Sequence, residues 1–107
     1  MDITHDRLDS FKLAAAKAVL DRVDMASLRQ HGISNLQRWR DSGVWCSAYG
    51  EWLNLLSDGS DAEIREAMIG ESENSNRLRQ SPPYTGLLSE PERIRLWREH
   101  VGQRLLD

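Results

Sequence analysis

The stretch DMASLRQHGISNLQRWRDSG, residues 24–43, decides how the chain folds. Its apolar side chains recur at three- and four-residue steps, which is the spacing of one helical face. This stripe consists of Met25, Leu28, Gly32, Leu36 and Trp39. We therefore predict one helix from Asp24 to Asp41, ended by Gly43 in the left-handed conformation that glycine favours. Gly32 either admits a closely packed neighbour or breaks the helix, since glycine inside a helix costs about 1 kcal/mol relative to alanine.

Helical periodicity also precedes and follows this stretch. A helix that starts after Thr4 or Asp6 and runs to about Arg22 has an apolar face formed by Leu8, Phe11, Ala15 and Val19 and widened by Leu13, Ala16 and Leu20. After residue 43, a helix capped by Ser47 is expected to run to about Ser57. Its apolar side consists of Tyr49, Trp52, Leu53 and Leu56.

Two capping boxes mark the starts of later helices. Ser60 and Glu63 have the reciprocal spacing of such a box and predict a short helix closed by Gly70. The polar residues 71–80 predict a solvent-facing helical turn or two, and residues 81–86 form a loop because they contain tandem prolines. Ser89 and Glu92 open the last helix, whose expected apolar face is Ile94, Trp97, Val101 and Leu105.

Length and composition place these helices in one domain. The chain has 107 residues, 39% of them hydrophobic and 29% charged, and this size and composition are typical of a globular domain with one modest core. We predict an all-α fold, a single compact bundle of four to five helices with short loops, covering residues 1–107. The four tryptophans, Trp39, Trp45, Trp52 and Trp97, are expected to form its core.

Composition also excludes several kinds of protein. No apolar run approaches the about 20 residues that span a bilayer, and the acidic, polar start lacks the features of a secretory signal. We therefore expect a cytoplasmic protein with no membrane partner. A single cysteine, Cys46, excludes an intramolecular disulfide and a multi-cysteine zinc site. The histidines at 5, 31 and 100 have no metal-ligand spacing and no phosphate-binding glycine loop occurs, so neither a metal nor a cofactor is predicted.

A helix-turn-helix motif is the first alternative to one continuous helix at residues 24–41. The segment from Leu28 to Ser34 contains the Gly32-Ile33-Ser34 sequence found at the turn of many DNA-binding domains. In that motif, however, the second helix buries residues six and nine positions after the turn glycine, and these are Arg38 and Asp41 here. The net charge of −3 also disfavours nucleic acid as a partner.

A cysteine-dependent enzyme is the second alternative. Cys46 precedes a predicted helix start, where the backbone amides and the helix dipole stabilise a thiolate, and His31 or His100 could serve as its base. Its neighbours Trp45 and Tyr49 instead favour a buried thiol that fills space in the core. We expect the packing role and no enzymatic activity.

Arginines and one tyrosine form the candidate binding surface. Arg77 and Arg79 precede a rigid proline turn that ends in Tyr84, and Arg and Tyr are frequent hot-spot residues in protein interfaces. Arg38 and Arg40 are expected to be exposed on the helix at residues 24–41. These five residues are our predicted contact surface for a protein partner.

The combination of residues 35–40, NLQRWR, and 77–84, RLRQSPPY, resembles small, uncharacterised all-helical bacterial proteins of the antitoxin type. The resemblance spans most of residues 34–98 and supplies no catalytic residue. It implies a partner-binding role. The sequence hypothesis is thus a non-enzymatic regulatory or interaction protein that acts by steric occlusion, with arginines pairing with acidic groups around an aromatic anchor.

Overall fold

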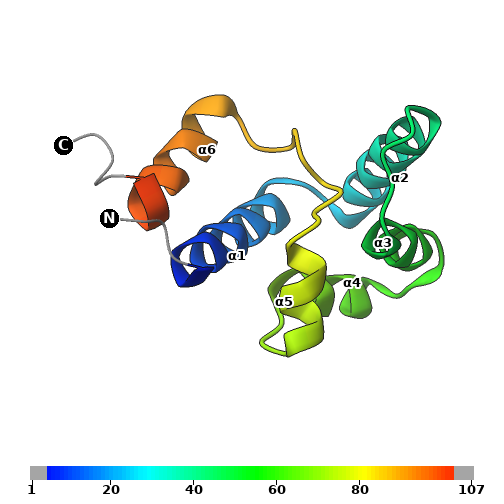
Figure 1. Cartoon of the computed structure of the whole chain (residues 1–107), viewed down its shortest axis with the longest axis horizontal. Coiled ribbons are helices and arrows are strands. Elements are labelled where there is room, and N and C mark those ends of the chain that lie inside the picture. Colours follow the sequence, from blue (N-terminus) through cyan, green and yellow to red (C-terminus); the bar gives the residue numbers. More distant parts are fainter. Residues whose placement is uncertain (1–4, 103–107) are drawn as a thin grey trace.

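A computed structural model describes residues 5–102 of the chain, and every regular element in this range is helical (Figure 1). The elements are α1 (His5–Arg22), α2 (Met25–Asp41), α3 (Ser47–Asp58), α4 (Asp61–Ile69), α5 (Glu73–Arg79), α6 (Glu90–Trp97) and the π-helical turn η1 (Arg98–Gly102). The all-α prediction is confirmed, but the described range contains six α-helices rather than four or five. The polar stretch 71–80 supplies α5, because Ser72 caps it by accepting a hydrogen bond from Ser75 N–H and Leu78 is buried.

Helix α1 is the element around which the chain is arranged. It packs against α4, α5, α6 and η1, whereas α2 and α3 pack mainly against each other and α3 also contacts α4. Figure 1 shows α1 at the centre, α6 on one side and the α2–α3 pair on the other. Residues 80–89, which we call the α5–α6 connection, cross between these two parts of the molecule. None of the described helices combines the length and apolar character needed to cross a bilayer.

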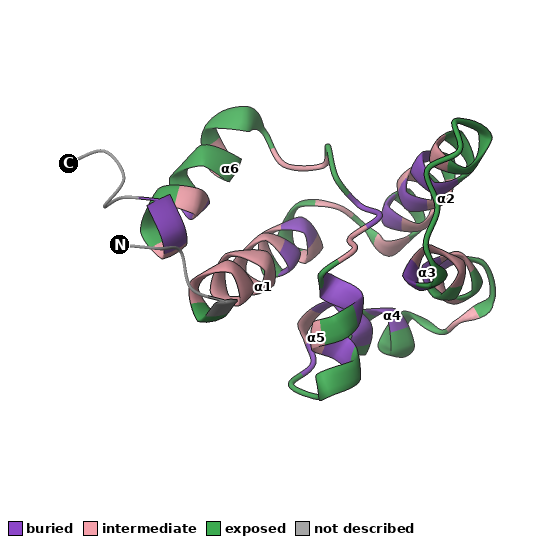
Figure 2. Cartoon of the chain, viewed as in Figure 1, coloured by how far each residue is buried: buried purple, intermediate pink, exposed green. Residues whose placement is uncertain are grey.

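Trp52 of α3 lies at the centre of the core. Its side chain is fully buried, its Nε1–H donates to the Leu78 carbonyl over 2.8 Å, and the Tyr84 ring meets it edge-on at 5.8 Å. The other buried hydrophobic residues of this core are Ala16, Val19, Leu28, Leu36, Ala48, Leu56, Ile64, Ala67, Met68 and Leu78 (Figure 2). The expectation that all four tryptophans form the core is wrong, since Trp39 and Trp97 are half-buried and Trp45 is 41% exposed.

Helix α2 is continuous through Gly32, as the apolar stripe predicted. A Cβ atom at Gly32 would lie 2.6 Å from Leu56 Cδ1, so the missing side chain lets α3 approach α2 closely. The chain turns later, at Gly43, whose φ of 83° is the left-handed conformation expected there. Gly32, Ile33 and Ser34 thus lie inside one helix, and the turn that a helix-turn-helix would need is absent from this segment.

The last helix departs from the predicted face. Its backbone changes to π-helical at Arg98, so Leu96 and Val101, five residues apart, are buried together. Ile94 is 36% exposed, which corrects its assignment to the apolar face, and Leu105 lies outside the described residues.

The two predicted capping boxes have different outcomes. Ser60 and Glu63 form both reciprocal hydrogen bonds at the start of α4. At the start of α6, Ser89 Oγ accepts from the Glu92 N–H, but the Glu92 carboxylate pairs with Arg22 and Arg95 instead of returning to the cap. Only one of the two hydrogen bonds of the second box therefore forms, because the Glu92 carboxylate instead links α6 to Arg22 at the end of α1.

Replacing Gly32 by alanine tests whether α2 and α3 touch at this point. We expect Gly32→Ala to lower the free energy of unfolding, because the clash with Leu56 outweighs the roughly 1 kcal/mol gained in helix propensity. Gly50 of α3 is the matched control, because no atom lies within 4 Å of the Cβ that alanine would add there. Gly50→Ala should raise the free energy of unfolding in urea titrations followed by circular dichroism. Equal stabilisation by both variants would contradict the packing described.

Candidate functional site

The α5–α6 connection is held in place by side chains of α2. Asn35 is buried, and its Nδ2 donates to the carbonyls of Pro83, at 2.9 Å, and Thr85, at 3.1 Å. His31 Nε2 lies 2.7 Å from the same Thr85 carbonyl and donates to it in the Nε2–H tautomer. Because proline has no N–H, this segment cannot form regular backbone hydrogen bonds within itself. Its buried carbonyls therefore need side-chain donors from other parts of the chain.

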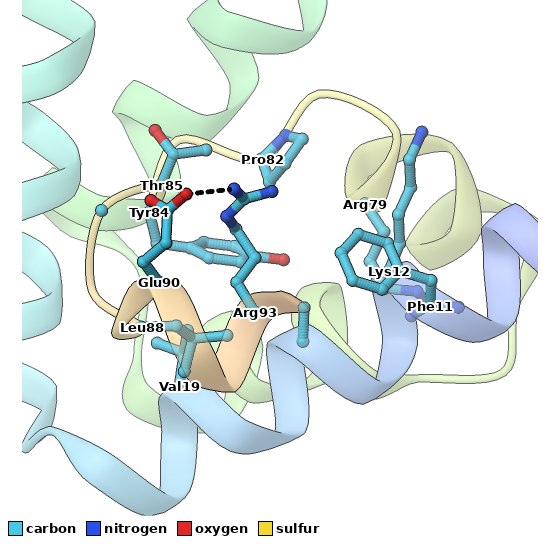
Figure 3. Close-up of a pocket in the computed structure, with 12 residues that line it drawn as sticks. Phe11, Lys12, Val19, Arg79, Pro82, Tyr84, Thr85, Leu88, Glu90 and Arg93 are labelled. Atoms are coloured by element: carbon cyan, nitrogen blue, oxygen red, sulfur yellow. Dashed lines mark hydrogen bonds and ion pairs between the residues drawn. The ribbon is translucent and has the colours of Figure 1, made fainter. Parts of the chain in front are cut away.

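A cavity of about 280 Å³ opens between this connection, α1 and α6 (Figure 3). The α1 wall is made by Phe11, Ala15 and Val19, which fall four residues apart and therefore share one helical face. Pro82, Tyr84 and Leu88 form the opposite apolar wall. The predicted apolar face of α1 is thus divided: Val19 is buried in the core, whereas Phe11 and Ala15 are half-buried and border the cavity.

Arg79 is the charged residue most deeply buried in the cavity wall. It is 6% exposed, and its Nη1 donates to the carbonyls of Met68, at 3.2 Å, and Gly70, at 2.8 Å. These carbonyls lie at the C-terminal end of α4, where helical carbonyls lack partners and the helix dipole favours a cation. The Nε of Arg79 is buried and has no hydrogen-bond partner.

Tyr84 reaches the cavity from the connection. The residue is 5% exposed, and burial raises the pKa of its hydroxyl well above the ordinary value, while the positive charge of Arg79 opposes that rise. Its hydroxyl makes no hydrogen bond to the residues that the structure describes. In Figure 3 this hydroxyl points into the space between the Tyr84 ring and Phe11.

Three charged side chains surround the cavity mouth. Arg93 Nη2 pairs with Glu90 Oε1 at 3.3 Å (Figure 3). The Lys12 ammonium donates to Gln80 Oε1 at 2.7 Å. Lys12 makes no ion pair with any described acid, so the mouth keeps a positive charge beside the neutral Arg93–Glu90 pair.

The structure separates the five residues predicted to form one contact surface. Arg79 and Tyr84 are buried, which corrects the expectation that both are displayed for a partner, since Arg79 caps α4 and Tyr84 packs on Trp52. Arg77 is exposed but forms a two-pronged pair with Glu51, at 2.7 Å for each bond. This hydrogen-bonded pairing lowers the pKa of the Glu51 carboxyl below its usual range.

Arg38 and Arg40 lie on α2 and are exposed, as predicted. Arg40 Cζ lies 5.8 Å from the centre of the Trp45 ring, a cation–π contact. Trp45 also meets Tyr49 edge-on at 5.7 Å. We call Arg40, Val44, Trp45 and Tyr49 the aromatic surface; it shares no residue with the cavity lining.

Cys46 lies beside this surface and is exposed, so the expectation of a buried space-filling thiol is wrong. It occupies the position before the first turn of α3, which was assigned to Ser47, and its side chain makes no capping hydrogen bond. The expected bases bond elsewhere, His31 to Thr85 and His100 Nδ1 to Ser10 Oγ at 2.6 Å. Within residues 5–102 no group of acids, histidines and cysteines is arranged to hold a metal ion.

Residues 5–102 thus form an all-helical fold with a mostly apolar cavity beside Arg79 and an exposed aromatic surface around Trp45. Comparisons with protein families, with curated proteins and with solved structures found no match to this chain. The resemblance to antitoxin-type proteins thus stays a prediction.

The sequence did not predict Lys12, Leu88 and Arg93 as cavity residues. The only signal of a cavity was that Phe11, Ala15 and Val19 share a helix face, and such a face is equally typical of a buried core.

Asn35 offers a test of how the connection is held. Asn35→Leu keeps a side chain of similar size but removes the donor to two carbonyls, so we expect it to lower the free energy of unfolding by about 1–3 kcal/mol. Asn54, exposed on α3, is the matched control, and Asn54→Leu should change stability by no more than about 0.5 kcal/mol. Urea titrations of both variants measure the difference. Equal effects would show that the bonds to Pro83 and Thr85 do not hold the connection.

Proposed function

We propose that this chain is a non-enzymatic interaction protein that binds a protein partner through the aromatic surface. The supporting observation is where apolar area is exposed. Three large hydrophobic side chains stand out as exposed in the described part of the chain, and two of them are neighbours: Val44 at 52% and Trp45 at 41%. A large indole left in water next to another apolar side chain is typical of an interaction site.

The geometry around Trp45 favours binding because the indole is already fixed. Gly43 reverses the chain, and the Val44 N–H donates to the Trp39 carbonyl at 2.8 Å, which ties the turn to the end of α2. The Trp45 ring also contacts both Tyr49 and the Arg40 guanidinium. A side chain that is ordered before binding loses less entropy in the complex.

The charges beside the indole indicate the kind of partner. Arg38 and Arg40 are both exposed, with Asp41 as the adjacent acid. The partner surface that fits is an apolar pocket for Trp45 with acidic groups at its rim. Binding there would act by steric occlusion, and an antitoxin-like neutraliser is one protein of this kind.

Affinity capture with matched variants tests this proposal. Wild-type protein, Trp45→Ala and Arg40→Glu are immobilised and exposed to an extract of the organism that encodes the chain, and retained proteins are quantified by mass spectrometry. Ile94→Ala is the control, because Ile94 is the third exposed hydrophobic residue and lies on α6. A protein retained by wild type and Ile94→Ala but reduced at least tenfold by both other variants is the expected result.

The purified partner must then bind directly and with the same variant pattern. Because arginines contribute, raising the salt concentration should slow association. Retention that is unchanged in Trp45→Ala and Arg40→Glu would contradict the proposal.

A further inference from the structure

The cavity between α1, α6 and the α5–α6 connection has a feature that packing does not explain. Arg79 is a buried cation, and no ion pair joins it to an acid among residues 5–102. The carbonyls at the end of α4 solvate the guanidinium without cancelling its charge, so an anion in the cavity is the ligand that would neutralise it.

The donors that Arg79 leaves unused lie on one edge of its guanidinium. Nη1 serves the carbonyls of Met68 and Gly70, whereas Nε has no partner and Nη2 makes no hydrogen bond to the described residues. Nε is enclosed by the protein, whereas Nη2 remains a donor for one oxygen of a carboxylate. The α4 end thus fixes the guanidinium through Nη1 and leaves Nη2 unused.

A second unused donor lies nearby. The Tyr84 hydroxyl has no partner in the described range, and Figure 3 shows it directed into the cavity. Its raised pKa keeps it protonated at neutral pH, so it donates a hydrogen bond rather than repelling an anion. Lys12 at the mouth adds a positive charge that favours entry of an anion.

The rest of the cavity is apolar and of limited size. Its walls are Phe11, Ala15, Val19 and Leu88, and its volume of about 280 Å³ is roughly twice the 150 Å³ that accommodates benzene in an apolar protein cavity. One aromatic ring or branched aliphatic group with a short acidic arm fills this space.

We propose that the cavity is a binding site for a small amphipathic carboxylate, whose acid group bonds Nη2 of Arg79 and the Tyr84 hydroxyl and whose apolar body lies against α1. This inference is independent of the proposed function, because the aromatic surface contributes nothing to the site.

Phenylpropionate is the probe, added to the full-length ¹⁵N-labelled protein and followed by two-dimensional NMR. The expected result is saturable shift changes at cavity residues, with binding at least tenfold tighter than that of phenylpropionamide, the neutral amide of the same shape. Absence of saturable shifts up to 10 mM probe, or equal binding of acid and amide, would overturn the proposal.

Two variants assign the site without disturbing the cap that Arg79 forms on α4. Tyr84→Phe keeps the ring on Trp52 and removes the hydroxyl, so binding should weaken about tenfold. Ala15→Leu fills the cavity and should abolish binding, whereas Ala26→Leu adds the same atoms at an exposed position and should not change it. Wild-type affinity in Ala15→Leu would show that the probe binds elsewhere and would contradict the site.

A short peptide used as a second probe distinguishes two kinds of ligand, a free small acid and the C-terminus of another protein. Acetyl-alanyl-phenylalanine presents the same ring and acid as a chain terminus, but its extra peptide unit exceeds the enclosed volume. We expect it to bind at least tenfold more weakly than phenylpropionate. Tighter binding of the peptide would overturn a free small acid as the ligand in favour of the C-terminus of another protein.

Discussion

Side-chain donors from α2 and α3 hold backbone carbonyls at the end of α5 and in the connection that follows it, and the rest of the structure depends on these bonds. Trp52 donates to the Leu78 carbonyl from the centre of the core, and Asn35 donates to the Pro83 carbonyl. The tandem prolines lack the N–H groups that a regular element would use. These bonds fasten the α2–α3 pair to the part of the molecule built on α1.

The same bonds decide which residues are available for binding. They draw Tyr84 inward onto Trp52 and keep Arg79 under the connection at the end of α4, so both line a cavity instead of the outer surface. The turn between α2 and α3 is left outside this arrangement, and there Trp45 remains exposed beside Arg40. The fold therefore separates the residues of the internal cavity from the exposed aromatic surface.

Local signals predicted much of the fold and little of the site. The stripe through Gly32 and the Ser60 capping box gave α2 and the start of α4, because periodicity and capping act within a few residues of the chain. The burial of Arg79 depends on carbonyls about ten residues away, and the exposure of Cys46 and Trp45 depends on where the α2–α3 turn lies. The π-helical turn that follows α6 has no sequence signal that we can identify.

Hydrogen exchange of the four indole N–H groups, followed by NMR, tests the account most directly. Trp52 Nε1–H is buried and bonded to Leu78, so it should exchange only when the whole protein unfolds, with a free energy of opening equal to that of global unfolding. The exposed Trp45 indole should exchange orders of magnitude faster. Exchange of Trp52 at the rate of Trp45 would show that the end of α5 is not held by the core, and would contradict the arrangement on which the cavity and the aromatic surface depend.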